Sequence, residues 1–308
     1  MGAAMFAFIA RRLVVSVLVA VTVSIVAFSF LRLSGDLPAL LAGENARPED
    51  IARIAAQYGF DKPLYQQYFD WAGRALHGDL GRSLFSGEPV SQLIVERLGV
   101  TVTLAVSALT LALLIAIPLG VIAATQPNSW VDRAALALAV TGQAMPNFWF
   151  ALILIYIFGV VLKLLPISGS ETWQHFVLPT VALAFSATPA FMRLTRTGML
   201  DVLASDYIRT AKAKGLRWPR ILFKHALRTA ILPIVSIAAV QLGFLLGGSV
   251  VIESVFALNG IGFLAFRSIS SADFPVVQSI LVFLSFGYIV LILIGDLINA
   301  RLDPRIRL

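Results

Sequence analysis

The chain has 308 residues, of which 58% are hydrophobic and 13% are charged. Because a soluble domain of this size carries about a quarter charged residues, this composition predicts an integral membrane protein. The absence of cysteine excludes disulfides, thiolate metal sites and a cysteine nucleophile. The net charge is +7, but the cations gather at the ends of apolar segments. We therefore expect membrane lipid, and no nucleic acid, as a partner.

Six apolar segments are long enough to cross a membrane as helices, since about 20 residues span a bilayer core. They are residues 13–31, 99–124, 134–162, 176–199, 229–256 and 276–300. The third is long for one crossing, and Pro146 predicts a tilt or a kink there. The fold class expected is all-α, a polytopic membrane protein with six transmembrane helices.

Three regions follow from this pattern. The first, residues 1–32, is an N-terminal transmembrane helix; a signal peptide is disfavoured because no small-x-small cleavage site follows it. Residues 33–98 form an extracytoplasmic region, in which acidic residues outnumber basic ones and prolines predict several short helices. Residues 99–308 form a five-helix transmembrane core with a cytoplasmic loop at residues 200–228.

Lysine and arginine set the expected orientation. Residues 163–175 and 257–275 carry few cations near the membrane, so we expect them outside. The turn between the fourth and fifth segments carries Arg193, Arg196, Arg209, Lys212, Lys214, Arg217, Arg220, Lys224 and Arg228. We therefore expect that turn and both termini in the cytoplasm.

The stretch SDYIRTAKAKGLRWPRILFKHALRTAILP, residues 205–233, predicts a short helix, a break and a second helix. Ser205 and the acidic residue after it suit a helix start. Gly215 stands where a left-handed helix end belongs, and Pro219 favours a new start. Small residues beside cations are typical of a docking element. An ordinary cytoplasmic loop made basic by the charge asymmetry is the alternative.

This stretch resembles the EAA loop of membrane subunits in binding-protein-dependent ABC importers. Arg209, Thr210 and Ala211 occupy the Glu-Ala-Ala positions, and Gly215 is the glycine of the motif. The Leu-Pro of the general motif is replaced by Leu227-Arg228, a departure that matches the peptide-importer branch. The resemblance implies docking of this loop on an ATPase subunit. The docking residues it implies are Asp206, Arg209, Thr210, Ala211, Lys212, Lys214, Gly215 and Leu216.

Further segments resemble the same family: YGFDKPLYQQYFDWAGRALHGDLGRSL (58–84), GGSVVIESVFALNGIGFLAFRSI (247–269) and, more weakly, MPNFW (145–149). Together they resemble the B-type permease subunit of a dipeptide/oligopeptide ABC importer, in the cytoplasmic membrane of a prokaryote. Nickel and glutathione importers share these motifs. The resemblance implies the type I importer permease fold, a second homologous permease subunit, two ATP-binding cassette subunits and an extracytoplasmic solute-binding protein.

No catalytic or metal site is predicted. The chain lacks a Walker phosphate loop, so ATP and magnesium are expected in the partner subunits, and no cofactor on this chain. Its three histidines are far apart in sequence, which disfavours a metal site. An ion-coupled secondary transporter, the alternative from another class, needs acids or discontinuous helices near mid-membrane. Glu253 and Asp296 lie near span ends instead.

Glu253 is the ionisable residue of most interest, because a charge inside a membrane must face protein or a wet cavity. Two interpretations are open: an interfacial acid that holds neighbouring loops, or a group that lines the outer mouth of a pathway. The candidates for the pathway and its outer gate are Pro146, Asn147, Gln241, Gly247, Glu253 and Phe256.

Overall fold

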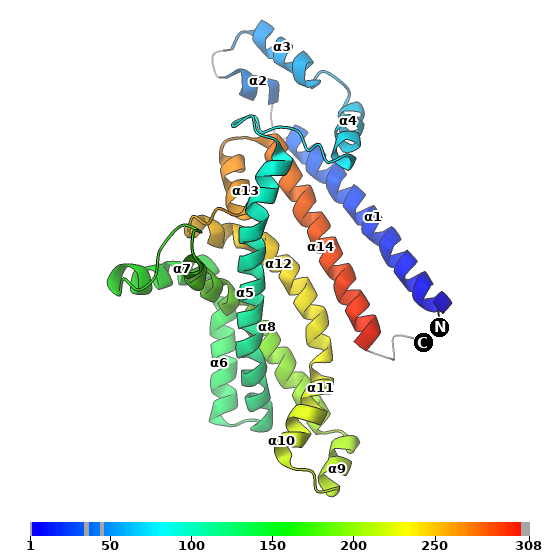
Figure 1. The fold of residues 1–308 in the computed structure, drawn as a ribbon, viewed down its shortest axis with the longest axis vertical. Helices are drawn as coiled ribbons and strands as arrows, with labels where there is room; N and C mark the ends of the chain where they lie inside the picture. Colours follow the sequence, from blue (N-terminus) through cyan, green and yellow to red (C-terminus); the bar gives the residue numbers. More distant parts are fainter. Residues whose placement is uncertain (1, 34–36, 44–45, 303–308) are drawn as a thin grey trace.

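The structure is a computed structural model that describes residues 2–33, 37–43 and 46–302. Five of its helices are long and apolar enough to cross a membrane. They are α1 (Gly2–Leu33), α5 (Val90–Thr125), α8 (Val177–Leu203), α12 (Leu232–Val255) and α14 (Phe274–Leu302) (Figure 1). Within the described residues the only extended pairing is one isolated bridge between Arg82 and Pro89. The predicted all-α fold is confirmed.

The third predicted segment is a broken pair of helices. α6 (Trp130–Ala144) and α7 (Asn147–Leu154), which continues as the π-helix Ile155–Val161, meet at an angle of 100°. Met145 between them is extended, the conformation that a residue before proline prefers. The bend lies where Pro146 predicts it, but it is a complete break and not a kink.

Two other helices extend beyond their predicted limits. The segment after Pro89 and the second predicted span form one helix, α5, which runs on through Pro118. α8 continues to Leu203 and therefore includes Arg193 and Arg196. The assignment of these two arginines to a basic turn is wrong, because both are helical and pair with α6 as described below.

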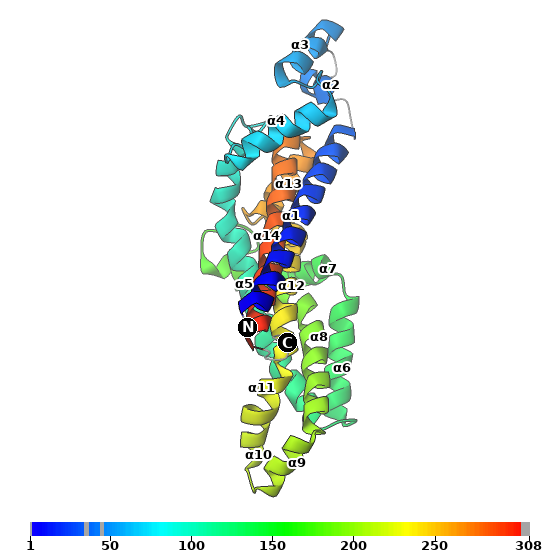
Figure 2. The same cartoon turned by 90° about the vertical axis from the view of Figure 1, so that its right-hand side faces the viewer.

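The short helices gather at opposite ends of the bundle (Figures 1 and 2). One end carries α2 (Leu37–Ala42), α3 (Pro48–Tyr58), α4 (Leu64–Leu76) and α13 (Ile261–Ser270), the last of which lies in a stretch expected to be a turn. The other end carries α9 (Asp206–Ala213), α10 (Trp218–Arg220), the π-helix Ile221–Ala226 and α11 (Leu227–Ala230). α1 begins and α14 ends away from the α2–α4 end.

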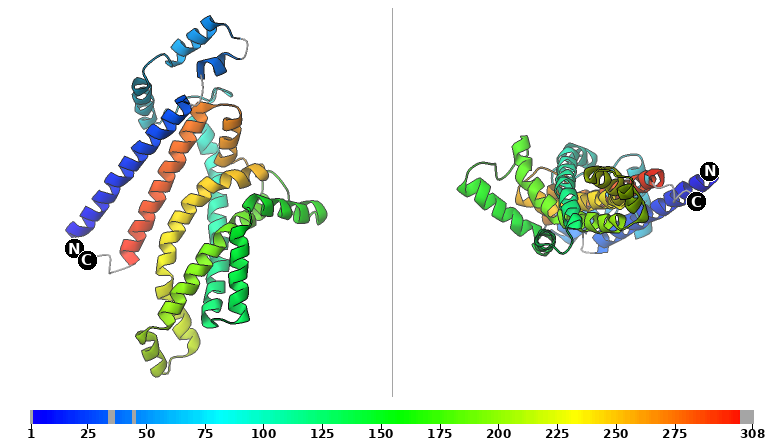
Figure 3. Two further views of the ribbon diagram at one scale, coloured as in Figure 1. Left: turned by 180° about the vertical axis from the view of Figure 1, so that it is seen from behind. Right: turned by 90° about the horizontal axis from the view of Figure 1, so that it is seen from below.

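The core is centred on α5 and α8, which pack along their length through small residues. Buried alanines line the contact: Ala105, Ala108, Ala112 and Ala116 from α5, and Ala182, Ala184 and Ala187 from α8. A Cβ on Gly120 would lie 2.6 Å from Cβ of Thr195, so glycine is needed for this approach. α1 stands apart from this core beside α14 (Figure 3), and its aliphatic side chains are largely exposed.

Candidate functional site: the α9 end and the buried acids

The α9 end has the backbone that the sequence predicts, with one difference at its start. Ser205 occupies the N-cap position, but its hydroxyl donates to the carbonyl of Val202 at 2.6 Å and does not cap α9. At the other end Gly215 has φ +71°, and its N–H donates to the carbonyl of Lys212 at 2.9 Å. The predicted left-handed glycine is confirmed.

One face of α9 is packed and the other is free. Ile208 and Ala211 are buried against a cluster that includes Val121 of α5 and Met199 of α8. Ala211, expected among the docking residues, therefore supports α9 from beneath and offers no free surface. Leu216 is half-buried. The exposed members of that set are Asp206, Arg209, Thr210, Lys212, Lys214 and Gly215.

Several polar contacts fix the loop around α9. Asp206 and Arg209 form an exposed ion pair at 3.3 Å. The ammonium of Lys212 lies 5.3 Å from the centre of the Trp218 ring, a distance suited to a cation–π contact. The hydroxyl of Tyr207 reaches Thr229 at 3.3 Å. The last two contacts join α9 to α10 and α11.

Just above this unit, α6 and α8 are joined by charge. Arg196 donates from Nε and Nη2 to the two carboxylate oxygens of Asp132, at 2.6 and 2.7 Å. Asp132 is 1% exposed and also accepts from the backbone N–H of Asn128. Arg193 donates to Oε1 of Gln143 at 2.6 Å. The Asp132–Arg196 pair was not predicted from the sequence, although an acid in the first turn of a helix, where Asp132 stands in α6, was a signal for it.

Glu253 lies at the opposite end and is 0% exposed. Its Oε1 accepts from the hydroxyls of Thr101 and Ser249 at 2.8 and 2.9 Å, and its Oε2 accepts from the N–H of Phe263 at 2.9 Å. Thr101 in turn accepts from the N–H of Ile261. The carboxylate joins α5, α12 and α13, the geometry of an acid that holds neighbouring segments, and it lines no open passage in this conformation.

A second buried acid, Asp273, lies at the same end. It is 3% exposed and accepts from the hydroxyl of Ser83 and from the N–H of Leu84 at 3.1 Å. These contacts tie the segment before α5 to the start of α14. Their partners are almost 190 residues apart in sequence, so no local pattern reveals them.

The other pathway candidates are spread over the bundle. Pro146 is exposed and Asn147 half-buried, both at the break between α6 and α7, while Phe256 is 1% exposed at the end of α12. Gly247 is exposed on α12, with open space beside it, and Gln241 is half-buried. The structure does not bring these six residues into one site.

No group of three or more His, Asp or Glu side chains in the described residues could hold a metal ion.

The structure defines the chain as a multi-helix membrane component that carries an exposed basic helix at one end. Residues 116–308 match the family "Binding-protein-dependent transport system inner membrane component", and residues 5–105 match its N-terminal family. The chain therefore belongs to the family of binding-protein-dependent inner membrane components, the permease subunits of ABC importers. It is a multi-pass inner membrane protein.

Named relatives cover nearly the whole chain. The "Glutathione transport system permease protein GsiC" of Escherichia coli O6:H1 (strain CFT073) is 37% identical over 304 residues, which are 98% of this chain and 99% of that protein. GsiC of Salmonella choleraesuis is 37% identical over the same shares, and that of Escherichia coli K12 is 36% identical.

Two solved structures of the MetNI methionine ABC transporter, in inward facing conformations, share the fold. One aligns with a TM-score of 0.58 at 21% identity over 70% of this chain and 99% of that chain. The other has a TM-score of 0.60 at 20% identity over 69% and 97%. The fold is thus that of an ABC importer permease. The family match, and not the broken α6–α7 pair, decides against the alternative of an ion-coupled secondary transporter.

Proposed function

We propose that this chain is the permease subunit of an importer for glutathione. The observation that carries the proposal is the 36–37% identity to GsiC permeases over 98% of the chain. A dipeptide or oligopeptide importer, expected from the motifs, is the second candidate and is favoured by the departure at Leu227-Arg228. Glutathione is itself a tripeptide, so both candidates fall within one chemical class.

The proposed assembly contains a second homologous permease, two ATP-binding cassette subunits and an extracytoplasmic solute-binding protein. Each chain offers one α9 helix, so one copy engages one ATPase subunit. ATP and magnesium are bound by the ATPase subunits. Isolation of a transport-competent complex with two copies of this chain and no second permease would contradict this composition.

We propose that α9 transmits ATPase movement to the membrane helices. Its exposed face carries Arg209 and Lys212, which suit acidic groups on a partner surface. Its buried face rests through Ile208 on α5 and α8, the two helices at the centre of the core. A displacement of α9 is therefore passed directly to the best-packed helix pair.

This mechanism requires the α9 end in the cytoplasm and the α2–α4 end outside, with both termini inside. The chain has no native cysteine, so a single introduced one reports cleanly. Ser86 is exposed at the α2–α4 end, and we expect an impermeant thiol reagent to label Ser86→Cys in intact cells. Labelling only after the cells are opened would overturn this orientation.

The function is tested by reconstituting the full assembly in liposomes with its solute-binding protein. We expect glutathione to stimulate ATP hydrolysis and labelled glutathione to accumulate. An alanyl dipeptide and a neutral tripeptide, each tested in the same preparation, serve as comparisons. Stimulation by those peptides without any response to glutathione would replace the proposal with the dipeptide/oligopeptide candidate.

A further inference from the structure

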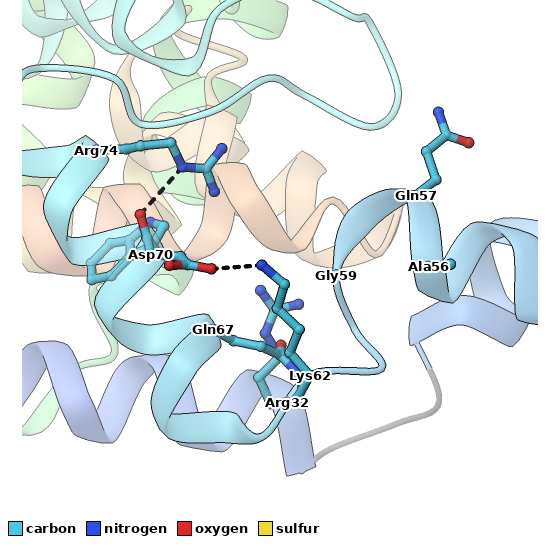
Figure 4. Close-up of a pocket in the computed structure, with 9 residues that line it drawn as sticks. Arg32, Ala56, Gln57, Gly59, Lys62, Gln67, Asp70 and Arg74 are labelled. Carbon is cyan, nitrogen blue, oxygen red and sulfur yellow. Dashed lines mark hydrogen bonds and ion pairs between the residues drawn. The ribbon is translucent and has the colours of Figure 1, made fainter.

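Two adjoining cavities open at the α2–α4 end of the bundle. The first has a volume of about 460 Å³ and the second about 540 Å³, sizes typical of small-molecule sites. Both are lined by Arg32 at the end of α1 and by Trp71 and Arg74 of α4. Figure 4 shows the first, with Arg32 and Lys62 on one side of Asp70 and Arg74 on the other.

Positive charge is in excess around these cavities. Their linings include four cations, Arg32, Lys62, Arg74 and Arg82, against two carboxylates. Asp70 is already paired with Lys62 at 3.0 Å, and the other carboxylate, on Asp79, accepts from the N–H of Gly81. Among the described residues no acid forms an ion pair with any of the three arginines. Arg74 donates from Nε to the backbone carbonyl of Asp70 at 3.4 Å, and Arg82 donates from Nη1 to that of Gly87 at 3.0 Å. The other N–H groups of these two arginines, and the guanidinium of Arg32, are left for a ligand.

Arg32 is held in place as a charged group. Its guanidinium carbon lies 5.0 Å from the centre of the Phe28 ring and 4.7 Å from that of Phe60. An arginine side chain keeps its charge at neutral pH. The two rings hold the Arg32 guanidinium in place, and no described acid pairs with it. Its N–H groups are therefore available to a ligand.

Unpartnered buried polar atoms are concentrated at the same place. In the described part of the chain four buried side-chain atoms lack a hydrogen-bond partner: Arg32 Nε, Gln67 Oε1, Gln278 Nε2 and Asp296 Oδ2. The last still forms an ion pair with Arg12 at 2.7 Å. The other three belong to residues that line the two cavities. An unpartnered buried group costs free energy, so a ligand that satisfies these atoms gains binding energy there.

The types of these atoms describe the ligand. Arg32 and Gln278 offer donors, and Gln278 is 4% exposed at the wall of the second cavity. Gln67 offers an acceptor in the first. A carboxylate binds an arginine side chain through two parallel hydrogen bonds, a geometry that the ammonium group of lysine does not provide. A peptide carries carboxylate oxygens and N–H groups a few ångströms apart, which fits donors in one cavity and an acceptor in the next.

We propose that the two cavities form one binding site for a carboxylate-bearing short peptide. The transported peptide binds at this site before it enters the membrane passage. Arg32 and Arg74 contact the carboxylate, Gln278 donates a further hydrogen bond, and Gln67 accepts from a peptide N–H. The identity of the peptide as glutathione rests on the proposed function; the carboxylate chemistry rests on the cavities alone.

The test is binding of labelled glutathione to the purified assembly without its solute-binding protein, measured by calorimetry. We expect Arg74→Gln to raise the Kd about tenfold, since a charge-assisted hydrogen bond is lost. Arg74→Lys keeps the charge without the fork and should lie between. The matched control is Arg53→Gln, the same charge change on α3, because Arg53 pairs with Asp50 and lines neither cavity. Glutathione diethyl ester, which lacks both carboxylates, should bind about tenfold more weakly to the wild type.

Three results would overturn the site: equal affinities of the Arg74→Gln and Arg53→Gln variants, equal binding of the diester, or an Arg74 dependence seen only in docking of the solute-binding protein. The third result would mean that the carboxylate bound by Arg74 belongs to the solute-binding protein and not to a peptide. If glutathione is taken up but its binding does not depend on Arg74, the proposed site is wrong and the proposed function stands. If an acidic dipeptide binds in an Arg74-dependent way and glutathione is not taken up, the site stands and glutathione is not the substrate.

Discussion

The two ends of the bundle carry their charges in opposite ways. At the α9 end Arg209, Lys212 and Lys214 are exposed, and the packed face of the helix is apolar. At the α13 end Glu253 and Asp273 are buried and accept hydrogen bonds from distant segments. The charges of α9 are thus exposed around an apolar packed face, whereas the two buried acids at the α13 end hold their own helices together.

This difference decides what a substitution does. Removing an exposed charge at the α9 end should leave the fold intact and change only the proposed docking surface, because water already solvates that group. Removing a buried acid at the α13 end leaves several donors without acceptors in a dry environment. The following substitutions test this contrast, beginning with the buried end.

Replacement of Glu253 should have the largest effect. Glu253→Leu leaves the hydroxyl of Thr101 and the N–H of Phe263 without their acceptor, and each unsatisfied buried donor costs about 1–3 kcal/mol. We expect the free energy of unfolding to fall by about 3 kcal/mol or more, with Glu253→Gln intermediate. Thermal unfolding of the purified chain in detergent measures this. Glu88→Gln is the control, since Glu88 is exposed. Equal losses of stability in Glu253→Gln and Glu88→Gln would show that Glu253 does not hold the α13 end.

The Asp132–Arg196 pair should come next. Asp132→Ala leaves Arg196 without its two-pronged acceptor, and loss of one partner from a buried pair costs about 3–5 kcal/mol. Arg196 is partly exposed, so we expect about 2 kcal/mol, the remainder being recovered by solvation. Asp201→Asn, at an exposed position on α8, should leave the unfolding temperature unchanged. A double substitution at Asp132 and Arg196 that is less stable than Asp132→Ala would contradict this account.

Substitution of Gly215 tests whether backbone strain at the α9 end affects the coupling of ATP hydrolysis to uptake. Its φ of +71° disfavours a side chain by about 1 kcal/mol, and more for a branched one. Nothing lies within 4 Å of the Cβ position, so the effect is backbone strain and not a clash within this chain. We expect Gly215→Val to leave the protein in the membrane and to lower co-purification of the ATPase subunits or uncouple hydrolysis from uptake. Gly78→Val is the control, because Gly78 has φ +83° and equally open space at the other end; identical coupling in both variants would make Gly215 an ordinary loop residue.

The sequence predicted the α9 end better than the α13 end, for a physical reason. Helix α9 is built from local signals, and the left-handed Gly215 follows from a glycine after a basic last turn. The direction of Ala211 was missed, because the motif does not say which face packs on α5 and α8. Pro146 likewise located the bend in the third segment but not its extent of 100°, which depends on what surrounds the two halves.

The α13 end and the cavities depend on contacts between distant residues. Glu253 meets Thr101 from 152 positions away, and Gln278 shares a cavity with Arg32 and Arg74 because α1 packs on both α14 and α4. Hydropathy placed Glu253 near a span end without showing what its carboxylate faces. A single sequence provides the length of each helix, whereas the partners of a buried polar group depend on how the helices pack.

The smallest expected effect on stability is that of the exposed Asp206–Arg209 pair, and it offers the clearest test of the α9 end. The two groups are 3.3 Å apart, with side chains 92% and 79% exposed, and exposed pairs contribute about 0.2–1 kcal/mol. Asp206→Asn should therefore leave the unfolding temperature unchanged, although it frees Arg209 and makes α9 more basic. If an acidic ATPase surface binds this face, the substitution should strengthen docking at low salt, and the gain should fade as ionic strength rises because the charges are screened. Arg209→Gln should weaken docking under the same conditions. Co-purification of the ATPase subunits over a series of salt concentrations measures both. Docking that ignores both substitutions at every salt concentration would mean that shape, and not charge, is recognised at this end.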